Sequence, residues 1–85
     1  MTLKEILEIL VKGIVQTEDR VVVTENIGEI MHGKEVLHFH IKVKQDEVPL
    51  LVGKGGSTIK ALRVVMAKLA GKHKKTAFVD LDETK

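Results

Sequence analysis

The stretch VGKGGSTIK, residues 52–60, contains three glycines and two lysines between two apolar runs. Glycines in an ordered segment allow a sharp turn or let another molecule approach the main chain closely. A helix that begins directly after them, at Ser57 and Thr58, would present unpaired amides that favour negative charge, and Lys54 adds a cation. These residue types at this spacing therefore indicate phosphate binding.

Spacing separates this stretch from two common nucleotide-binding motifs. A Walker loop requires a Gly-Lys pair followed by Ser or Thr, whereas here Lys54 precedes Gly55 and Gly56. A dinucleotide fingerprint requires a preceding strand and a third glycine, but a short helix is predicted before Gly53, and Thr58 occupies the third position. We therefore expect no nucleotide cofactor, and the chain indicates no other cofactor. What remains is a G-x-x-G turn between two helices.

The net charge of +2 conceals an uneven distribution of charges along the chain. Residues 48–79 contain seven basic side chains and no acidic one. Such a region projects a positive potential that suits a polyanionic partner. An ordinary solvated helix face with a basic loop would show the same pattern of charges, and this alternative stays open. The seven residues are Lys54, Lys60, Arg63, Lys68, Lys72, Lys74 and Lys75.

Periodicity predicts the elements that must position the turn. Thr2 and Glu5 have the spacing of a capping box, and apolar residues then recur at helical intervals to about Val15. Two strands follow, DRVVVTE and EVLHFHIKV, with the polar, glycine-punctuated segment NIGEIMHGK as their connection. Asp46 is expected to cap a short helix that ends at Gly53.

The remaining elements complete an α+β pattern. A second helix is predicted from Ser57 to Ala70, where Gly71 stops it, and TAFVDL alternates as a last strand. The apolar face of that helix consists of Ile59, Leu62, Val65, Met66 and Leu69. The buried face of the strand EVLHFHIKV consists of Leu37, Phe39, Ile41 and Val43. We expect residues 1–85 to form a single domain in which three helices cover one face of a three-stranded sheet.

Composition limits the cellular setting and the chemistry. The chain has no cysteine, which fits a reducing cytoplasm, and charges interrupt its apolar N-terminal segment, so that neither a signal peptide nor a membrane span is predicted. His38 and His40 share a face of one strand, but no cysteine or matching carboxylate joins them, and no metal site is expected. No nucleophile beside a base and no local pair of acids is present, so that an enzyme is not expected either.

The run LLVGKGGSTI resembles the signature of KH domains, in which an aliphatic pair, Gly-x-x-Gly and a later Ile join two helices. The predicted order helix, strand, strand, helix, helix, strand resembles the type II version of that fold. In length, N-terminal helix and the continuation STIKALR, the chain looks most like KhpA, a family of small bacterial single-KH RNA-binding proteins. KH turns clamp a backbone of about four nucleotides.

The resemblance implies a site for single-stranded RNA. In KH domains the bases enter an aliphatic groove, which here would be lined by Leu51, Val52 and Ile59, although an ordinary core role for these three stays open. The sheet and the loop GKHKK would supply the opposite wall of that groove. The residues expected to bind RNA are Gly53, Lys54, Gly55, Gly56, Ser57, Thr58, Lys60, Arg63, Lys72, Lys74 and Lys75.

The predicted function is binding of single-stranded RNA without catalysis, as an RNA chaperone or post-transcriptional regulator. DNA stays an alternative ligand, because no contact to a 2′-hydroxyl is identified. With only Phe39 and Phe78, the chain lacks the aromatic platform of RRM and OB domains. Phe78 is out of phase with its buried neighbours, and an exposed ring there would suggest a homodimer or a contact with a second KH protein. The alternative function is a protein-interaction module that uses the open face of the sheet.

Overall fold

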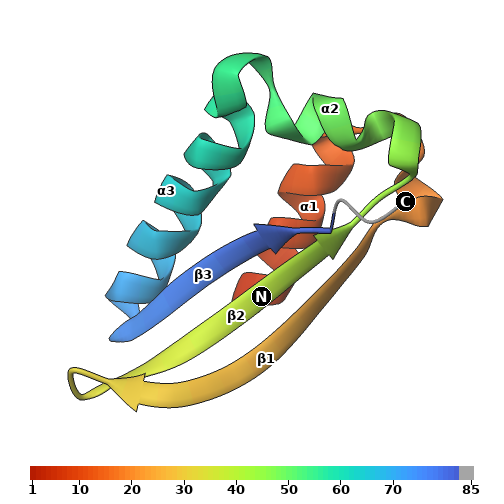
Figure 1. Ribbon diagram of the computed structural model, residues 1–85. Helices are drawn as coiled ribbons and strands as arrows, with labels where there is room; N and C mark the ends of the chain where they lie inside the picture. The colour runs from red at the N-terminus through yellow and green to blue at the C-terminus, as the bar shows by residue number, and fades with distance from the viewer. Residues whose placement is uncertain (83–85) are drawn as a thin grey trace.

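The computed structural model describes residues 1–82, which fold into three helices and three strands joined by short connections (Figure 1). The helices are α1 Leu3–Ile14, α2 Val48–Val52 and α3 Ser57–Lys72. The strands are β1 Val22–Met31, β2 Lys34–Lys42 and β3 Lys75–Leu81. Single 3₁₀ turns occupy η1 Glu18–Arg20, η2 Gln45–Glu47 and η3 Lys54–Gly56. The predicted α+β class and element order are confirmed.

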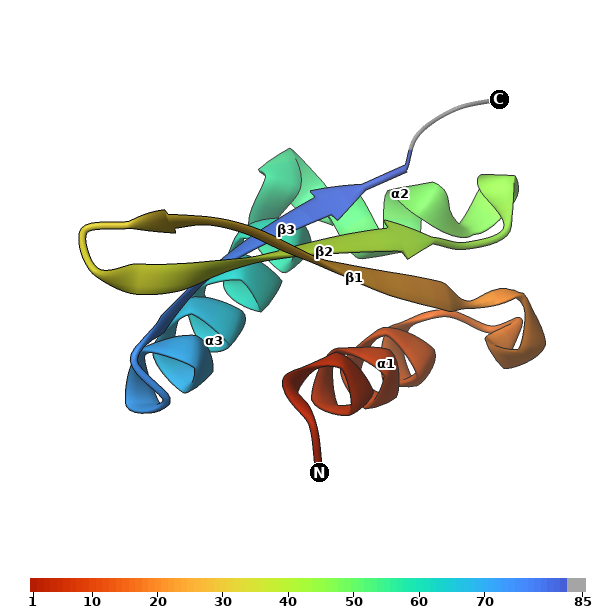
Figure 2. The same cartoon turned by 90° about the horizontal axis from the view of Figure 1, so that it is seen from below.

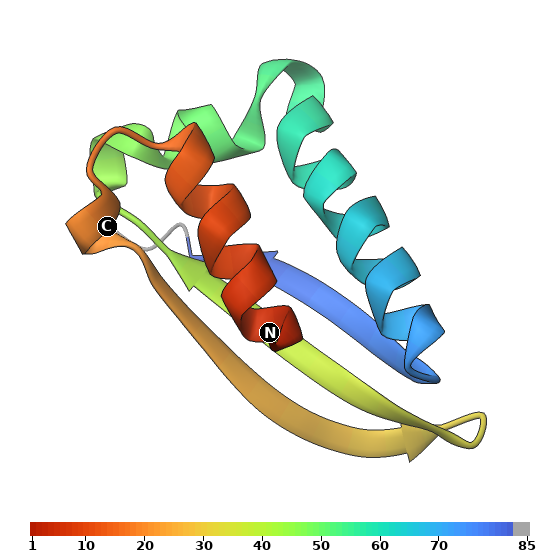
Figure 3. The same cartoon turned by 180° about the vertical axis from the view of Figure 1, so that it is seen from behind.

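The helices and the sheet form two layers. The strand order is β1-β2-β3, with β1 antiparallel to β2 and β2 parallel to β3. Helices α1 and α3 lie across one face of the sheet, and α2 packs against both of them near the end where β2 finishes (Figure 2, Figure 3). In residues 1–82 no helix covers the opposite face, and none is both long and apolar enough to cross a bilayer.

The core lies between these layers. The predicted inward face of β2 is buried, and its central residue Phe39 is only 1% exposed. Helix α1 contributes Leu7 and Val11, and α3 contributes Leu62 and Met66, all of which are 6% exposed or less. Val65 of α3 is 41% exposed, however, so that its predicted place on the apolar face is wrong. The face that α3 presents to the core is therefore narrower than the sequence pattern indicates.

The start of α1 is fixed by the predicted capping box. The main-chain N–H of Glu5 donates to Thr2 Oγ1 at 3.1 Å, and the main-chain N–H of Thr2 donates to Glu5 Oε1 at 3.0 Å. The hydrogen bond from the Thr2 main chain lowers the pKa of Glu5 most. Two donors that a helix end would leave without a partner are thus satisfied.

The connection between the first two strands differs from the prediction. Strand β1 continues through the expected polar segment to Met31, and only His32 and Gly33 form the turn. Both have positive φ, 52° and 76°, as tight two-residue hairpins require. Ile27 pairs with Leu37 and Ile30 pairs with Glu35 on either side of a register shift in the ladder. The glycine in this segment suggested a loop, so that the continued pairing was not expected. The result is a long β-hairpin.

Two helix boundaries also differ. Asp46 does not cap α2, because Glu47 directly precedes that helix and no side chain caps it. Gly71 does not stop α3, which continues to Lys72. The chain reverses instead at Lys74, a non-glycine residue with a φ of 57°. Helix α3 is therefore about half a turn longer than predicted before the chain turns into β3.

Glu47 is a buried carboxylate that fastens the chain after α1 to the start of α2. It is 6% exposed, and its Oε1 accepts the main-chain N–H groups of Gln16 and Thr17 at 2.5 and 2.8 Å. A hydrogen bond with the Thr17 side chain is the largest cause that lowers the pKa of Glu47 below its ordinary value of 4.5, and the two main-chain donors lower it further. The charged form therefore stabilises the fold.

We expect Glu47→Gln to lower the urea midpoint of unfolding at pH 7, because the amide accepts these hydrogen bonds less strongly. Since the folded pKa lies below the unfolded one, the contribution of the carboxylate is complete above about pH 4.5 and is lost as the pH falls through the folded value. The difference between wild type and variant should therefore shrink below pH 4.5. Urea titrations from pH 3 to 7, with the exposed Glu18→Gln as control, measure it. A difference that is constant with pH would contradict the assignment.

Candidate nucleic-acid interface

Residues 53–56 form the bend that joins α2 to α3 (Figure 1). Gly53 has φ 74° and ψ 172°, Gly55 has φ 63° and ψ 20°, and Gly56 has φ 79° and ψ 14°. Side chains disfavour all three conformations. A Cβ on Gly53 would lie 2.8 Å from the main-chain nitrogen of Thr58, whereas a Cβ on Gly55 would meet nothing within 4 Å. Gly53 is thus required by packing, and Gly55 leaves the main chain bare and exposed.

The amides of the bend are partly engaged within the protein. The N–H of Gly56 donates to the carbonyl oxygen of Gly53 at 3.1 Å, and the N–H of Ser57 donates to that of Lys54. The prediction of an unpaired amide at Ser57 is therefore wrong. Ser57 is exposed, whereas Thr58 is half-buried against Gly53. No side chain caps α3, so that the positive end of its dipole stays open to an anion.

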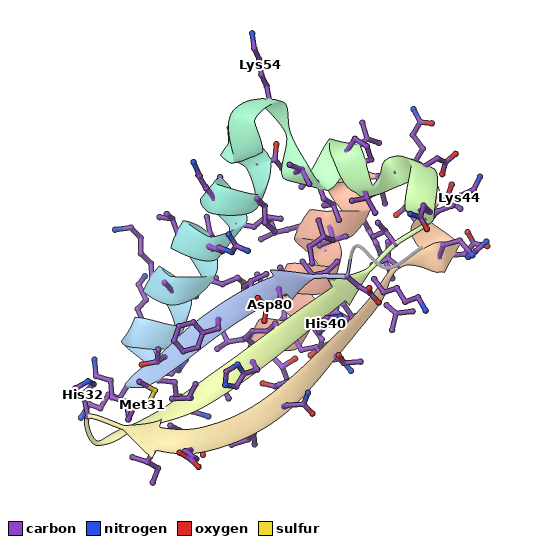
Figure 4. All side chains as sticks on the ribbon, in the orientation of Figure 1. Met31, His32, His40, Lys44, Lys54 and Asp80 are labelled. Atoms are coloured by element: carbon purple, nitrogen blue, oxygen red, sulfur yellow. The ribbon has the colours of Figure 1, made fainter. Side chains whose placement is uncertain are left out.

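Three predicted cations lie at the bend and along the first two turns of α3. Lys54 projects from the bend, away from the rest of the molecule (Figure 4). Lys60 is exposed and reaches back over the bend, since its Cε lies 3.7 Å from where a Cβ of Gly56 would be. Arg63 donates from Nε to the carbonyl oxygen of Val79 at 3.0 Å, which ties α3 to β3. Lys54, Lys60 and Arg63 are called the turn cluster below.

The other three cations that were expected to bind RNA lie at the opposite end of α3 (Figure 1). The helix has 16 residues. Its ends are therefore about 24 Å apart. Lys75 there pairs through Nζ with Oε1 of Glu35 at 3.1 Å. Contrary to the prediction, Lys72, Lys74 and Lys75 do not form a groove wall that faces the glycine turn.

The predicted aliphatic lining divides between core and surface. Leu51 is fully buried and Ile59 is 7% exposed, and both belong to the main core. Of the three candidates only Val52 is half-buried, beside Gly53. The alternative that the sequence left open, an ordinary core role, therefore describes Leu51 and Ile59.

The space beside the turn cluster is a hollow of about 370 Å³ between α3 and β3. It is lined by Arg63, Ala67, Ala77, Phe78, Val79 and Asp80. The small side chains of Ala67 and Ala77 leave the hollow unfilled. Arg63 contributes a positive charge, and Asp80 contributes a carboxylate on the open face of the sheet (Figure 4). The sequence predicted a groove with the sheet as a wall, but of the residues that line this hollow it predicted only Arg63 as part of the site. Small residues on two elements expected to be neighbours were the signal that could have revealed it.

A larger hollow, of about 560 Å³, lies away from the turn. Its walls come from the N-terminal half of α1, the C-terminal end of α3 and the sheet beneath them. They are largely apolar, with Ile6, Ile27 and Leu69 beside His73 and Lys75. No residue of the glycine turn lines it, so that it takes no part in the candidate interface.

The open face of the sheet carries the two predicted histidines, both exposed. The ring of His38 stacks on that of Phe78, with centroids 5.4 Å apart and planes inclined by 21°. His40 Nε2 lies 3.8 Å from Oδ2 of Asp82. Within residues 1–82 no group of three or more His, Cys, Asp or Glu is arranged to hold a metal ion. Phe78 itself is 44% exposed, as its phase in the strand predicts.

Comparison with solved structures supports the fold. The Era protein of Aquifex aeolicus bound to GDP·AlF4⁻ matches 93% of this chain with a TM-score of 0.67 at 19% identity. Era in complex with MgGDPNP and nucleotides 1506–1542 of 16S ribosomal RNA matches with a TM-score of 0.68, also at 19% identity. The present chain spans 29% and 28% of those two chains, so that the likeness concerns one part of Era.

Comparison with characterised sequences covers nearly the whole chain. RNA-binding protein KhpA of Thermotoga maritima is 39% identical over 72 residues, which are 85% of this chain and 89% of that protein. RNA-binding protein KhpA of Streptomyces coelicolor is 32% identical over 83 residues, which are 98% and 99% of the two chains. The family model for the KH domain of KhpA/KhpB matches residues 4–81. The chain therefore belongs to the KhpA/KhpB family of KH-domain proteins.

Proposed function

We propose that this protein binds single-stranded RNA and that the glycine turn holds the RNA backbone. The observation that carries the proposal is the bare, exposed main chain at Gly55, which lies between Lys54 and the uncapped end of α3. Relatives whose alignments cover 85% and 98% of this chain are named RNA-binding proteins, and one structural neighbour is described in complex with 16S ribosomal RNA. Backbone amides and a lysine at a helix start are suited to phosphate.

The proposed path of the RNA follows the turn cluster. Lys54 and Lys60 would contact phosphates at the bend, and Arg63 would contact the RNA further along α3, beside the hollow. The hollow then replaces the aliphatic groove predicted from Leu51 and Ile59, because those side chains are buried. Binding needs no chemical step, and we propose no catalytic role.

The salt dependence of RNA affinity tests the proposal. Each phosphate neutralised on a single strand contributes about −0.7 to the slope of log K against log salt, so that the three cations of the turn cluster predict a slope of about −2. Contacts from all seven basic residues of residues 48–79 would give about −5. Anisotropy titrations of a labelled ten-nucleotide RNA from 50 to 400 mM KCl measure the slope, and DNA of the same sequence tests the choice of sugar. A slope near zero would overturn the phosphate clamp.

We further propose that the protein acts in the cytoplasm as an RNA chaperone or post-transcriptional regulator, together with a partner protein. A homodimer or a pair with a second KH protein has a surface available on α3, where Val64 and Val65 are 53% and 41% exposed. Sedimentation of the purified protein between 1 and 100 μM tests the homodimer. A monomer at every concentration would leave only a second KH protein as the partner.

A further inference from the structure

Phe78 occupies a place where two features of the structure meet. Phe78 lines the hollow between α3 and β3, and its ring stacks on that of His38, which is paired with it in the register of β2 and β3. The side chain is 44% exposed, although the ring is supported on one side by the imidazole. An aromatic ring is therefore held in place while part of its surface faces open space.

We propose that Phe78, supported by His38, is a base-stacking residue of the interface, so that a nucleobase enters the hollow and lies against the phenyl ring. This inference rests on the proposed RNA binding. Unstacked bases of single strands bind well to aromatic side chains, and a ring that is already held loses little conformational freedom when it binds. The hollow of about 370 Å³ also falls within the range of small-molecule sites, about 300–1,000 Å³.

The hollow offers polar groups as well as a ring. Asp80 lines it two residues after Phe78, and its carboxylate can accept a hydrogen bond from an exocyclic amino group such as N4 of cytosine. Arg63 lines it from α3 and places positive charge near the phosphates. Ring, carboxylate and guanidinium together match the parts of a nucleotide.

The distance from the glycine turn suits a single strand held there. Arg63 follows Ser57 by six residues, which is about 9 Å along the helix. Its Nε bonds to the carbonyl oxygen of Val79, the residue next to Phe78. The main chain at Phe78 therefore lies alongside the second turn of α3, and the hollow that Phe78 and Arg63 line is within reach of the roughly four nucleotides that a KH turn clamps.

The surroundings of the ring favour a base over a protein partner. On the open face, Phe78 alternates with Thr76 and Asp80 along β3, and His40 lies beside Asp80 on β2. Specific protein interfaces bury about 800 Å² on each partner around an apolar centre. The apolar neighbour Val36 is only 1% exposed, so that the exposed surroundings of the ring are polar and fit a single stacked base better.

Three variants and one spectroscopic probe test this inference. Phe78→Leu keeps an apolar side chain but removes the ring, Phe78→Trp keeps an aromatic ring, and His38→Ala removes its support. A ten-nucleotide oligoadenylate with 2-aminopurine at its central positions reports affinity by anisotropy and stacking by fluorescence quenching. We expect quenching in the wild type, roughly tenfold weaker binding with loss of quenching for Phe78→Leu, and binding within about twofold of wild type for Phe78→Trp. His38→Ala should fall between them.

Val22→Ala, on the exposed outer face of β1, is the matched control and should bind as wild type does. Wild-type affinity and quenching for Phe78→Leu would overturn the stacking role while leaving the clamp intact. If Phe78→Leu instead changes only the sedimentation coefficient, the ring belongs to a protein contact. If Phe78→Leu does not fold, absence of quenching in the wild-type complex still refutes the stack. Absence of any RNA binding by the wild type refutes the proposed function itself.

Discussion

Lys54→Asp combined with Gly55→Asp is expected to abolish RNA binding, with a loss of at least roughly 100-fold, because two negative charges then stand where phosphates are proposed to bind. The fold should survive. A Cβ at residue 55 meets nothing within 4 Å, and Lys54 projects into solvent. Aspartate also tolerates positive φ better than most residues. Anisotropy titration at 100 mM KCl measures the loss.

A neutral pair of substitutions separates charge from shape. Lys54→Gln with Gly55→Asn adds side chains of nearly the same size without negative charge, and it should weaken binding by only a few fold, as loss of about one phosphate contact implies. Circular dichroism and thermal unfolding must show that both double variants are folded. Wild-type affinity for the aspartate variant would refute the clamp.

Gly53→Ala is expected to cost about 3 kcal/mol of unfolding free energy, since a φ of 74° with a ψ of 172° is open essentially only to glycine. The added Cβ would also press on Thr58, at 2.8 Å from its main-chain nitrogen. Either α2 or the first turn of α3 must then move. For a domain of this size the loss corresponds to a fall in Tm of roughly 15 °C, which differential scanning calorimetry measures.

Gly55→Ala is the matched control for that change. Its φ of 63° is also positive, but its ψ of 20° lies close to the left-handed helical region, and no atom stands within 4 Å of the new Cβ. A loss of about 1 kcal/mol is expected. Equal losses at the two positions would show that the contact with Thr58 does not decide the stability of the bend.

The fold was largely predictable because its signals are local. The alternation around Phe39 and the capping box at Thr2 depend on neighbours in the chain, and both are confirmed. The end of β1 was not predictable in the same way. Ile27 and Ile30 remain in a strand because β2 pairs with them across a register shift, and a glycine between them hides this long-range partner.

The candidate site was predictable only in part, for a similar reason. Spacing alone indicates the glycine turn, and the structure bends there. Leu51 and Ile59 flank the bend and are buried in the core. The sequence pattern of an apolar residue at a helix end is the same whether the residue faces the core or a groove. The hollow depends on Ala67 and Ala77, which come together only when β3 lies beside α3. Such contacts between distant segments leave little trace in a single sequence.

The hydrogen bond from Arg63 to the carbonyl oxygen of Val79 bears on how the protein avoids aggregation. Strand β3 is an edge of the sheet, and an edge with unpaired carbonyl groups can recruit a strand from another molecule. Arg63 occupies one of these acceptors, and α3 runs alongside the same border. On the flank of the molecule that is proposed to receive RNA, one rung of this edge is thereby unavailable to an added strand, so that an extended peptide would find the ladder interrupted at Val79.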